Sequence, residues 1–249
     1  MQTESASPMA ELPSILIMGA AGVIGRAASR LLSAQGYPLV LADRDAAAVE
    51  ALAQSLNHAS WLRGDATDPG DVAEIFAKAG PGLGCVVLAV GSEGPVGALE
   101  DCADDDFHQA MTLNVTSVWL GLKAALKVLK PKGKGSIVVL SSISGTMGMP
   151  MMSAYAAGKH AVLGLVRSAA REAAASGVRI NAVCPGPVVS DMMRRVDNGL
   201  GRADAAGSIP MQRYAEPDEV AHMIAFLCSD ASSYSTGSSF MLDGGYGCR

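Results

Sequence analysis

The sequence has few aromatic residues, no dense run of positive charge and no long apolar stretch free of polar residues. Aromatics make up 4% of the 249 residues, while 49% are hydrophobic, so a sizeable core is available and a disordered chain is excluded. The formal net charge of -5, without a basic cluster, argues against nucleic acid as a partner. The best candidate for a membrane span, residues 111–129, contains Asn114, Lys123 and Lys127, which argues against insertion in a bilayer.

Cysteine pairs and targeting signals are also missing. The five cysteines are odd in number and scattered, with no C-x-x-C pair, so we expect reduced thiols, a cytoplasmic location and no metal site. They are Cys85, Cys102, Cys184, Cys228 and Cys248. Residues 1–13 lack a basic region followed by an apolar run, so we expect a flexible tail there and no signal peptide.

Short apolar runs alternate with helical patterns along the rest of the chain. The runs are residues 14–18, 38–42, 59–63, 85–90, 136–140, 179–184 and 238–242. The clearest helical patterns are residues 26–35, 45–57, 104–130, 154–175 and 216–228. This alternation predicts an α/β fold, a doubly wound parallel sheet of about seven strands with helices on both faces. Without a linker or internal repeat, residues 14–249 are expected to form a single domain.

The first apolar run leads into a glycine-rich turn that is followed by a helix. The turn reads Gly19-Ala-Ala-Gly22-Val-Ile-Gly25. Glycines let a backbone approach a pyrophosphate closely, and the helix N-terminus offers free N–H groups to the phosphates. A strand, this turn and a helix in succession predict a dinucleotide site, although a plain tight turn is the alternative.

Acidic residues follow the second and third runs. Asp43 comes 18 residues after Gly25, where a doubly wound fold places the acid that accepts the adenosine ribose hydroxyls. A carboxylate there would repel the 2′-phosphate of NADP, whereas the adjacent Arg44 would attract it. Asp43 could instead cap the next helix. Asp65 could face the adenine or simply cap its own turn.

Tyr155 and Lys159 are four residues apart, so on a helix their side chains leave the same face. An ammonium beside a phenol favours the phenolate and lowers the tyrosine pKa from about 10 toward the range useful for proton transfer. Ser142 follows the fifth run and therefore lies at the carboxyl end of the sheet, where such folds bind ligands. Taken alone, the Tyr155–Lys159 spacing also fits an ordinary surface pair.

Three further stretches bear on function. Asn114 is a polar residue among apolar neighbours, and such a residue is more often structural than catalytic. Residues 154–175 are apolar around much of the helix, which predicts a subunit interface. Residues 188–213 form a long segment at the ligand end, where lids are common, and a surface loop is the alternative.

Together these motifs resemble the short-chain dehydrogenase/reductase family, in its single-domain branch of about 250 residues. The resemblance extends from Ile15 to Gly245. It depends on the glycine turn and on Asp43, Asp65, Asn114, Ser142, Tyr155-x-x-x-Lys159, Asn181-Ala-Val-Cys-Pro-Gly186 and Leu242-Asp-Gly-Gly245. It implies a Rossmann-type fold, a homotetramer or dimer, and an oxidoreductase that moves a hydride between nicotinamide and a secondary alcohol or ketone.

The resemblance also assigns residues. The implied catalytic residues are Asn114, Ser142, Tyr155 and Lys159. The implied cofactor-binding residues are Gly19, Gly22, Val23, Ile24, Gly25, Asp43, Arg44, Asp65, Ala66, Leu88, Ala89, Gly91, Tyr155, Lys159, Pro185, Gly186, Val188 and Ser190. Tyr155 is then the general acid/base, assisted by Ser142 and Lys159. Asn114 would distort its helix and hold a water that relays protons through Lys159. Because of Asp43 we expect NAD, with NADP as the less favoured cofactor.

The chain departs from the family pattern at three places. Met18 and Val23 stand where the family has Thr and Gly in the glycine turn. Leu88-Ala-Val-Gly91 replaces the family's N-N-A-G, and Ser190 replaces a frequent Thr. The resulting G-x-x-G-x-x-G spacing is similar to that of the epimerase-like branch, whose members usually carry a substantial additional substrate domain.

Three alternative functions therefore stay open: an NADP-dependent ketoreductase of the 3-oxoacyl type, an epimerase-like enzyme or a non-catalytic dinucleotide-binding protein. If the protein is an enzyme, the methionines in residues 145–152 and in the 188–213 segment predict a pocket for an apolar alcohol or ketone, for which a cyclic compound is the expectation. They could equally fill the core. The substrate is expected to be a small molecule.

Overall fold

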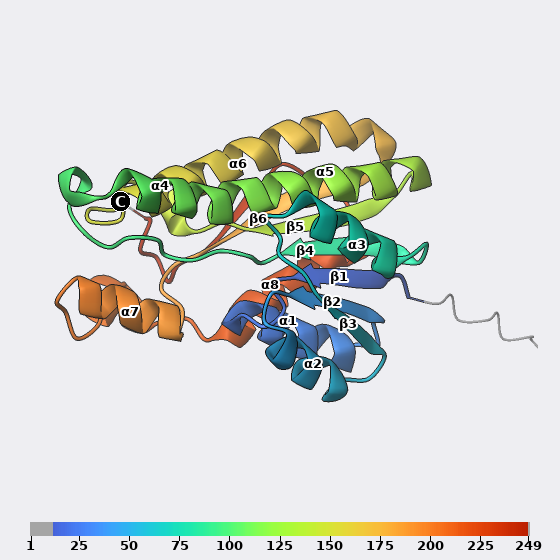
Figure 1. Ribbon diagram of the computed structural model, residues 1–249, viewed down its shortest axis with the longest axis horizontal. Coiled ribbons are helices and arrows are strands. Elements are labelled where there is room, and N and C mark those ends of the chain that lie inside the picture. Colours follow the sequence, from blue (N-terminus) through green and yellow to red (C-terminus); the bar gives the residue numbers. More distant parts are fainter. Residues whose placement is uncertain (1–11, 249) are drawn as a thin grey trace, which may run out of the picture.

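The computed structural model describes residues 12–248, and most of the tail expected at residues 1–13 lies outside this range. Seven parallel strands form one sheet in the order β3-β2-β1-β4-β5-β6-β7 (Figure 1). The strands are β1 (Ser14–Met18), β2 (Leu39–Asp43), β3 (Ala59–Arg63), β4 (Leu83–Leu88), β5 (Gly135–Leu140), β6 (Val178–Pro185) and β7 (Ser239–Leu242). The expected doubly wound α/β fold is confirmed.

Helices cover both faces of this sheet. They are α1 (Val23–Ala34), α2 (Ala46–Gln54), α3 (Pro69–Ala79), α4 (Asp104–Met111), α5 (Ser117–Leu129), α6 (Ser153–Ala173), α7 (Asp191–Gly199) and α8 (Pro217–Cys228). In Figure 1, α3, α5 and α6 lie on one side of the sheet, and α1, α2 and α8 lie on the other. Helix α7 projects from the body of the molecule beyond the carboxyl ends of the strands.

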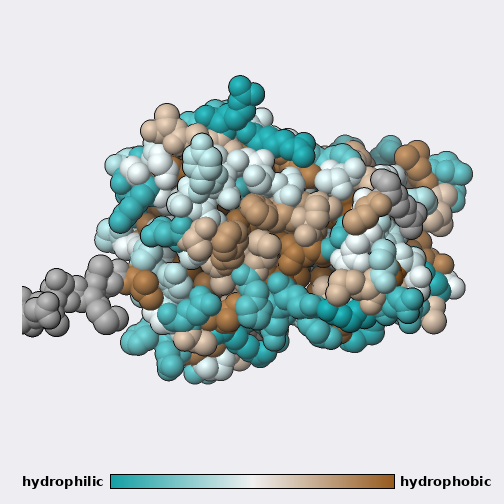
Figure 2. All heavy atoms as spheres, turned by 180° about the vertical axis from the view of Figure 1, so that it is seen from behind, coloured by the Kyte–Doolittle hydropathy of each residue, from teal (hydrophilic) through white to brown (hydrophobic). Residues whose placement is uncertain are grey.

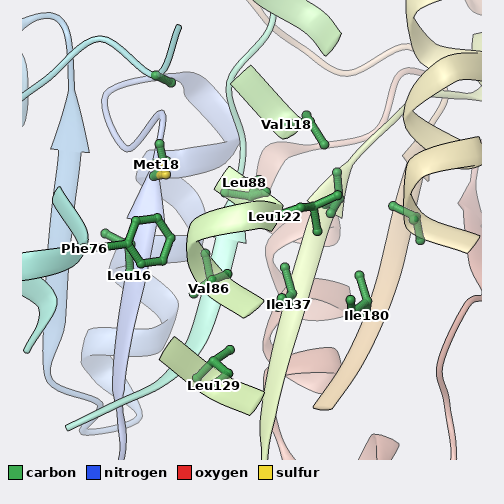
Figure 3. Packing of buried hydrophobic residues seen from close by; sticks show 14 of the residues in the cluster. Leu16, Met18, Phe76, Val86, Leu88, Val118, Leu122, Leu129, Ile137 and Ile180 are labelled. Atoms are coloured by element: carbon green, nitrogen blue, oxygen red, sulfur yellow. The ribbon is translucent and has the colours of Figure 1, made fainter. Parts of the chain in front are cut away.

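The core consists of two layers, because successive strand residues point to opposite faces. On β1, Leu16 and Met18 belong to the layer under α3, α5 and α6, which Figure 3 shows from close by. Ile15 and Ile17 belong to the opposite layer, under α1, α2 and α8. Both layers are almost fully closed to solvent, which explains why the strands read as continuous apolar runs.

Local sequence signals explain where several helices begin. The Asp68 side chain accepts hydrogen bonds from the N–H groups of Gly70 and Asp71, and Pro69 occupies the first turn of α3. Helix α8 begins with a reciprocal capping box between Glu216 and Glu219. These polar groups satisfy N–H donors that have no partner inside the helix.

Three stretches differ from the expected pattern. Residues 104–130 are not one regular helix, because a π-helical turn, η2 (Thr112–Thr116), separates α4 from α5. Residues 188–213 are not an irregular loop, because they contain α7, which Ser190 caps by accepting a hydrogen bond from the Met193 N–H. Helix α1 also begins three residues before the predicted start, since the last glycine of the turn is already helical.

Some hydrophobic side chains stay at the surface. On the face turned away in Figure 1, apolar residues gather in the centre, between hydrophilic margins (Figure 2). Trp119 on α5 is 53% exposed, and Phe226 and Met241 are also exposed. Within residues 12–248, no helix has the length and apolar character needed to cross a bilayer, and all five cysteines are free thiols.

Candidate active site

A cavity of about 490 Å³ opens at the carboxyl ends of the central strands. Strand β1 lies between β2 and β4, so the chain reverses its direction of winding at this point. Such a crevice is where open α/β sheets bind ligands. The cavity is bordered by the glycine turn, by the segments that follow β4, β5 and β6, and by α7.

The glycine turn brings the backbone close to neighbouring strands and to itself. Gly19 has φ +82, and a Cβ atom there would lie 2.8 Å from the carbonyl carbon of Ala89. A Cβ atom on Gly25 would lie only 2.2 Å from the Gly19 carbonyl oxygen. Gly22, the residue before α1, has no side chain to cap the helix, and it lines the cavity. The first N–H groups of α1 are therefore accessible to a phosphate.

Asp43 lies at the end of β2 and supports the same turn. Its Oδ2 accepts a hydrogen bond from the Ala21 N–H at 2.9 Å, and its Oδ1 accepts one from the Asp45 N–H at 3.1 Å. Each carboxylate oxygen has a second lone pair, so Asp43 can still accept ribose hydroxyls. The helix cap of α2 is Asp45, whose side chain accepts from the Ala48 N–H. The neighbouring Arg44 is exposed.

Asp65 supports its own turn. Its Oδ1 accepts hydrogen bonds from both the N–H and the hydroxyl of Thr67, at 2.8 and 2.7 Å. These bonds stabilise the carboxylate and hold the pKa of Asp65 below its usual value. Of the two readings of Asp65, the turn cap is present in the structure.

Ser142, Tyr155 and Lys159 come together at the cavity, from the end of β5 and the first turns of α6. Burial raises the pKa of Tyr155, hydrogen bonding with Ser142 lowers it, and the charges of Glu93 and Cys184 raise it further. Burial is the largest of these effects. The pKa of Tyr155 is therefore raised by burial, and the lowering expected from Lys159 does not outweigh this effect.

Lys159 is nearly fully buried and is held in a fixed position. Its ammonium donates a hydrogen bond to the Leu140 carbonyl at 3.1 Å and lies 5.6 Å from the centre of the Tyr155 ring. Burial lowers the pKa of Lys159 to about 8. The side chain is thus close to the phenol and poised near neutral pH, which suits a group that exchanges protons.

Asn114 occupies the π-helical turn, as the expected distortion of its helix requires. Its Nδ2 donates to the carbonyls of Ala110 and Ser92, both at 3.0 Å, and its Oδ1 accepts from the Ser92 N–H at 3.3 Å. Asn114 is completely buried. A Cβ atom on Gly91 would lie 2.8 Å from Asn114 Oδ1 and 3.2 Å from Lys159 Nζ. Glycine at position 91 therefore leaves the space between the amide and the lysine open.

Packing explains how the chain tolerates the departure at Leu88. The Leu88 side chain is 3% exposed and belongs to the core layer under α5. A Cβ atom on Gly121 of α5 would lie 2.7 Å from a methyl carbon of Leu88. Glycine in α5 thus makes room for a leucine where the family has an asparagine. Met18, the other apolar replacement, is also buried in this layer.

Most of the predicted site residues line the cavity. They are Gly22, Val23, Ile24, Gly25, Ala89, Gly91, Ser142, Tyr155, Lys159, Pro185, Gly186, Val188 and Ser190. The other predicted residues are not among those that line it: Gly19, Asp43, Arg44, Asp65, Ala66, Leu88 and Asn114. Among these, Leu88 was predicted to contact the cofactor, and the structure places its side chain in the core instead.

Sequence reasoning missed an ion pair at the cavity. Arg195 on α7 donates from Nε to Glu93 Oε1 at 2.5 Å and from Nη2 to Oε2 at 3.2 Å. Both residues line the cavity. The pair joins residues 102 positions apart, so no local spacing pointed to it. The one available signal was that Glu93 follows closely after the position of the family's N-N-A-G.

The residues present fit a nicotinamide dinucleotide. The glycine turn leaves space that a Cβ atom would fill, α1 presents its N-terminus, and Asp43 offers carboxylate oxygens for a ribose. The buried Lys159 and the partly buried Tyr155 line the same cavity. Phosphate and reacting centre can therefore be held together along one crevice.

A family model described as enoyl-(acyl carrier protein) reductase matches residues 19–247. The chain belongs to the short-chain dehydrogenase/reductase family, and it is an NAD(P)-dependent oxidoreductase that acts on CH–OH groups. The similarity to the family that the motifs indicated is thus confirmed over nearly the whole of the described chain.

Two curated relatives are similar over most of their length. The cis-4-hydroxycyclohexanecarboxylate dehydrogenase of Sinomonas cyclohexanicum is 37% identical, over 93% of this chain and 95% of that protein. The 2,5-dichloro-2,5-cyclohexadiene-1,4-diol dehydrogenase of Sphingobium indicum is 36% identical, over 94% of this chain and 96% of that protein.

Solved structures agree with this assignment. Levodione reductase superposes with a TM-score of 0.90 at 30% identity, covering 95% of this chain and 98% of that one. A structure described as ElxO with NADP bound has a TM-score of 0.88 at 28% identity, covering 95% and 99%. The family therefore includes a structural neighbour that binds NADP, and the choice between NAD and NADP has to be argued from this chain's own residues.

Proposed function

We propose that this protein is an NAD-dependent dehydrogenase/reductase that interconverts a secondary alcohol and a ketone on a six-membered carbon ring. The observation that carries the proposal is the meeting of Ser142, Tyr155 and Lys159 in one cavity with the glycine turn. Both curated relatives have names that specify a ring alcohol, which supports a cyclic substrate for this chain as well. The methionines at the cavity, Met149, Met152, Met192 and Met193, supply an adaptable apolar wall for such a ring.

In this mechanism Tyr155 is the general acid/base. During oxidation its phenolate takes the proton of the substrate hydroxyl, and during reduction its phenol returns a proton to the carbonyl oxygen. Ser142 donates a hydrogen bond to the same oxygen and stabilises the charge that develops there. The nicotinamide, when bound, supplies the hydride chemistry.

Lys159 and Asn114 act behind the tyrosine. The lysine ammonium lies 5.6 Å from the Tyr155 ring, where its positive charge favours the phenolate. Its pKa of about 8 lets it pass a proton on during turnover. The Asn114 amide borders the space beside Lys159 Nζ, which is where a relay water would be held.

The preference for NAD follows from Asp43. Its carboxylate lies against the glycine turn, where a 2′-phosphate would meet a negative charge. Arg44 next to it is exposed, and Arg26 lines the cavity with its Nε bonded to the Ala21 carbonyl at 2.6 Å. These arginines, together with the NADP-bound structural neighbour, support an NADP-dependent ketoreductase as the second candidate.

Fluorescence titration of the purified protein with NADH and NADPH tests the choice. We expect tighter binding of NADH, and we expect Asp43→Asn to weaken NADH binding while improving NADPH binding. Asp105→Asn serves as the control, because Asp105 is exposed on α4 and does not line the cavity. Tighter binding of NADPH by the unmodified protein would favour the second candidate. Binding of a dinucleotide without turnover of any alcohol or ketone would point to the non-catalytic alternative, and binding of neither dinucleotide would contradict the proposal.

Three accompanying features belong to the same proposal. Residues 188–213, which contain α7 and the Arg195 side chain at the cavity, act as a lid. The exposed Trp119 on α5 supports a homo-oligomer, a dimer or tetramer. Free thiols at all five cysteines fit an enzyme that works in the cytoplasm.

A further inference from the structure

Glu93 and Arg195 form an ion pair among the residues that line the cavity, which also include the charged residues Arg26, Lys159, Asp191 and Arg202. Glu93 lies directly after Ser92, whose backbone is fixed by two hydrogen bonds to Asn114. The following chain is fixed as well, since the Gly97 N–H donates to the Met151 carbonyl at 2.8 Å. Glu93 is therefore presented to the cavity from a rigid segment.

The two partners are buried to different extents. The Glu93 side chain is 12% exposed, whereas the Arg195 side chain is 60% exposed. Glu93 is close enough to the reacting centre for its charge to raise the pKa of Tyr155. The carboxylate is therefore the more enclosed of the two partners, and the more exposed guanidinium comes from the lid helix α7.

A buried ion pair adds little to the free energy of folding, because the cost of removing two charges from water is about as large as their attraction. A pair that lines a ligand cavity has another use, because a bound polar group completes its hydrogen bonding. The carboxylate oxygens can accept further bonds beyond those from the arginine. The arginine carries five N–H donors, of which two to Glu93 are accounted for.

We propose that Glu93 and Arg195 recognise a second, uncharged oxygen of the substrate, a hydroxyl or carbonyl on the far side of the ring from the reacting carbon. This inference depends on the proposed function, since it specifies the substrate of the same site. A ring hydroxyl donates to Glu93 and accepts from Arg195, and a ring carbonyl accepts from Arg195. The name of the curated diol dehydrogenase specifies two such oxygens, at positions 1 and 4.

The order of the two charges selects against an anion. A carboxylate at the far side of the ring would be repelled by the enclosed Glu93 carboxylate and would compete with it for Arg195. Repulsion between like charges in a partly buried site costs more than at the surface. This chain is therefore expected to prefer a 1,4-diol to a 4-hydroxycarboxylate.

The test compares kcat/KM for cyclohexanol, 1,4-cyclohexanediol and 4-hydroxycyclohexanecarboxylate. The unmodified enzyme should prefer the diol to both others, because a site built to bond a hydroxyl rejects an analogue without it. In Glu93→Leu the preference for the diol over cyclohexanol should fall by about tenfold or more. The same variant should gain activity on the carboxylate relative to the diol, since Arg195 is then free to pair with it.

Two further variants complete the series. Arg195→Met should also reduce the diol preference, but without the gain for the carboxylate. Arg194→Gln is the matched control, because Arg194 is on the same helix and pairs with Asp191 at the surface. Its side chain is 72% exposed, so its removal should leave the substrate preference unchanged. Equal preferences in Glu93→Leu and in the unmodified enzyme would overturn the inference.

A binding measurement separates this inference from the proposed function. Calorimetric titration of cyclohexanol and 1,4-cyclohexanediol into the protein with NADH present does not depend on turnover. Tighter binding of the diol, lost in Glu93→Leu, supports the recognition of a second oxygen even if no alcohol is oxidised. Equal or undetectable binding of both compounds overturns it. Turnover of cyclohexanol and diol at equal rates would overturn the inference and leave the hydride-transfer proposal standing.

Discussion

At the scale of single residues, Tyr155 combines two opposing requirements. It must be buried to meet the substrate away from water, and burial raises its pKa. It must also release a proton, and hydrogen bonding with Ser142 offsets part of the rise in its pKa.

Replacing Tyr155 with Phe removes the proton acceptor and leaves the ring. We expect turnover to fall by at least about 100-fold, which is the usual contribution of a general acid/base. Binding of NADH should persist, because the glycine turn and Asp43 are untouched. Steady-state kinetics and fluorescence titration measure the two effects. Tyr234→Phe is the control, since Tyr234 is fully exposed. A Tyr155→Phe enzyme with near-normal turnover would disprove the assignment.

The pH dependence of oxidation should respond to Glu93. Oxidation requires the phenolate, so kcat/KM should rise with pH toward the raised pKa of Tyr155. The negative charge of Glu93 contributes to that raised pKa, so Glu93→Gln should lower it and move the rise to lower pH. A pH profile of alcohol oxidation measures the shift.

Glu100→Gln provides the control for this experiment, because Glu100 is an exposed acid outside the cavity. Its pH profile should match that of the unmodified enzyme. A profile for Glu93→Gln that is unchanged, or displaced to higher pH, would show that Glu93 does not act on Tyr155.

The sequence predicted those site residues whose neighbours are close along the chain. A spacing of four residues places Tyr155 and Lys159 on one helix face, and Ser142 follows from the end of a strand. Glu93 and Arg195 could not be paired in the same way, because both are charged residues in segments that read as exposed loops. Only the folded chain brings them within bonding distance.

At the scale of secondary-structure elements, β4 and α5 pack together through one large residue and one glycine. Leu88 fills the space that Gly121 leaves in α5. This contact was not predictable, since Gly121 alone reads as a weak point in a helix. The alternation of strands and helices was predictable, because buried parallel strands are continuous apolar runs.

Leu88→Ala should destabilise the protein by about 2–5 kcal/mol, the usual cost of emptying a leucine site in a core. Urea unfolding measures the loss. Affinity for NADH should change little, because the Leu88 side chain does not line the cavity. Leu99→Ala is the control, since Leu99 is 70% exposed and should have little effect. An unchanged stability with weakened NADH binding would mean that Leu88 serves the cofactor after all.

The predicted helices differ from the observed ones at two places close to the site. The helical pattern of residues 104–130 gives no sign of the π-helical turn, although Asn114 at its centre was singled out for its polarity. Helix α7 was not predicted, because residues 188–213 combine methionines, charges and glycines without a clear period. Its cap at Ser190 forms only in the folded chain.

At the scale of the whole molecule, the fold could be predicted from the alternation of strands and helices. The oligomeric state stays a prediction. A chain of 25.4 kDa with an exposed Trp119 on α5 should sediment as a dimer or tetramer. Trp119→Glu should shift it toward the monomer, because a charge would then be buried in the interface. Lys78→Glu on α3 is the control. Sedimentation of the unmodified protein as a monomer would disprove the expectation.

The packing of α8 against α1 has a consequence for how the protein is made. These two helices lie side by side under the same face of the sheet, and Cys228 at the end of α8 reaches Cys85 of β4 with 2.9 Å between the sulfur atoms. During synthesis α1 and the neighbouring strands emerge long before α8. Their apolar surface is therefore exposed to solvent while the intervening chain is translated. Nascent chains that stop before α8 should be bound by chaperones, and those that include it should be released.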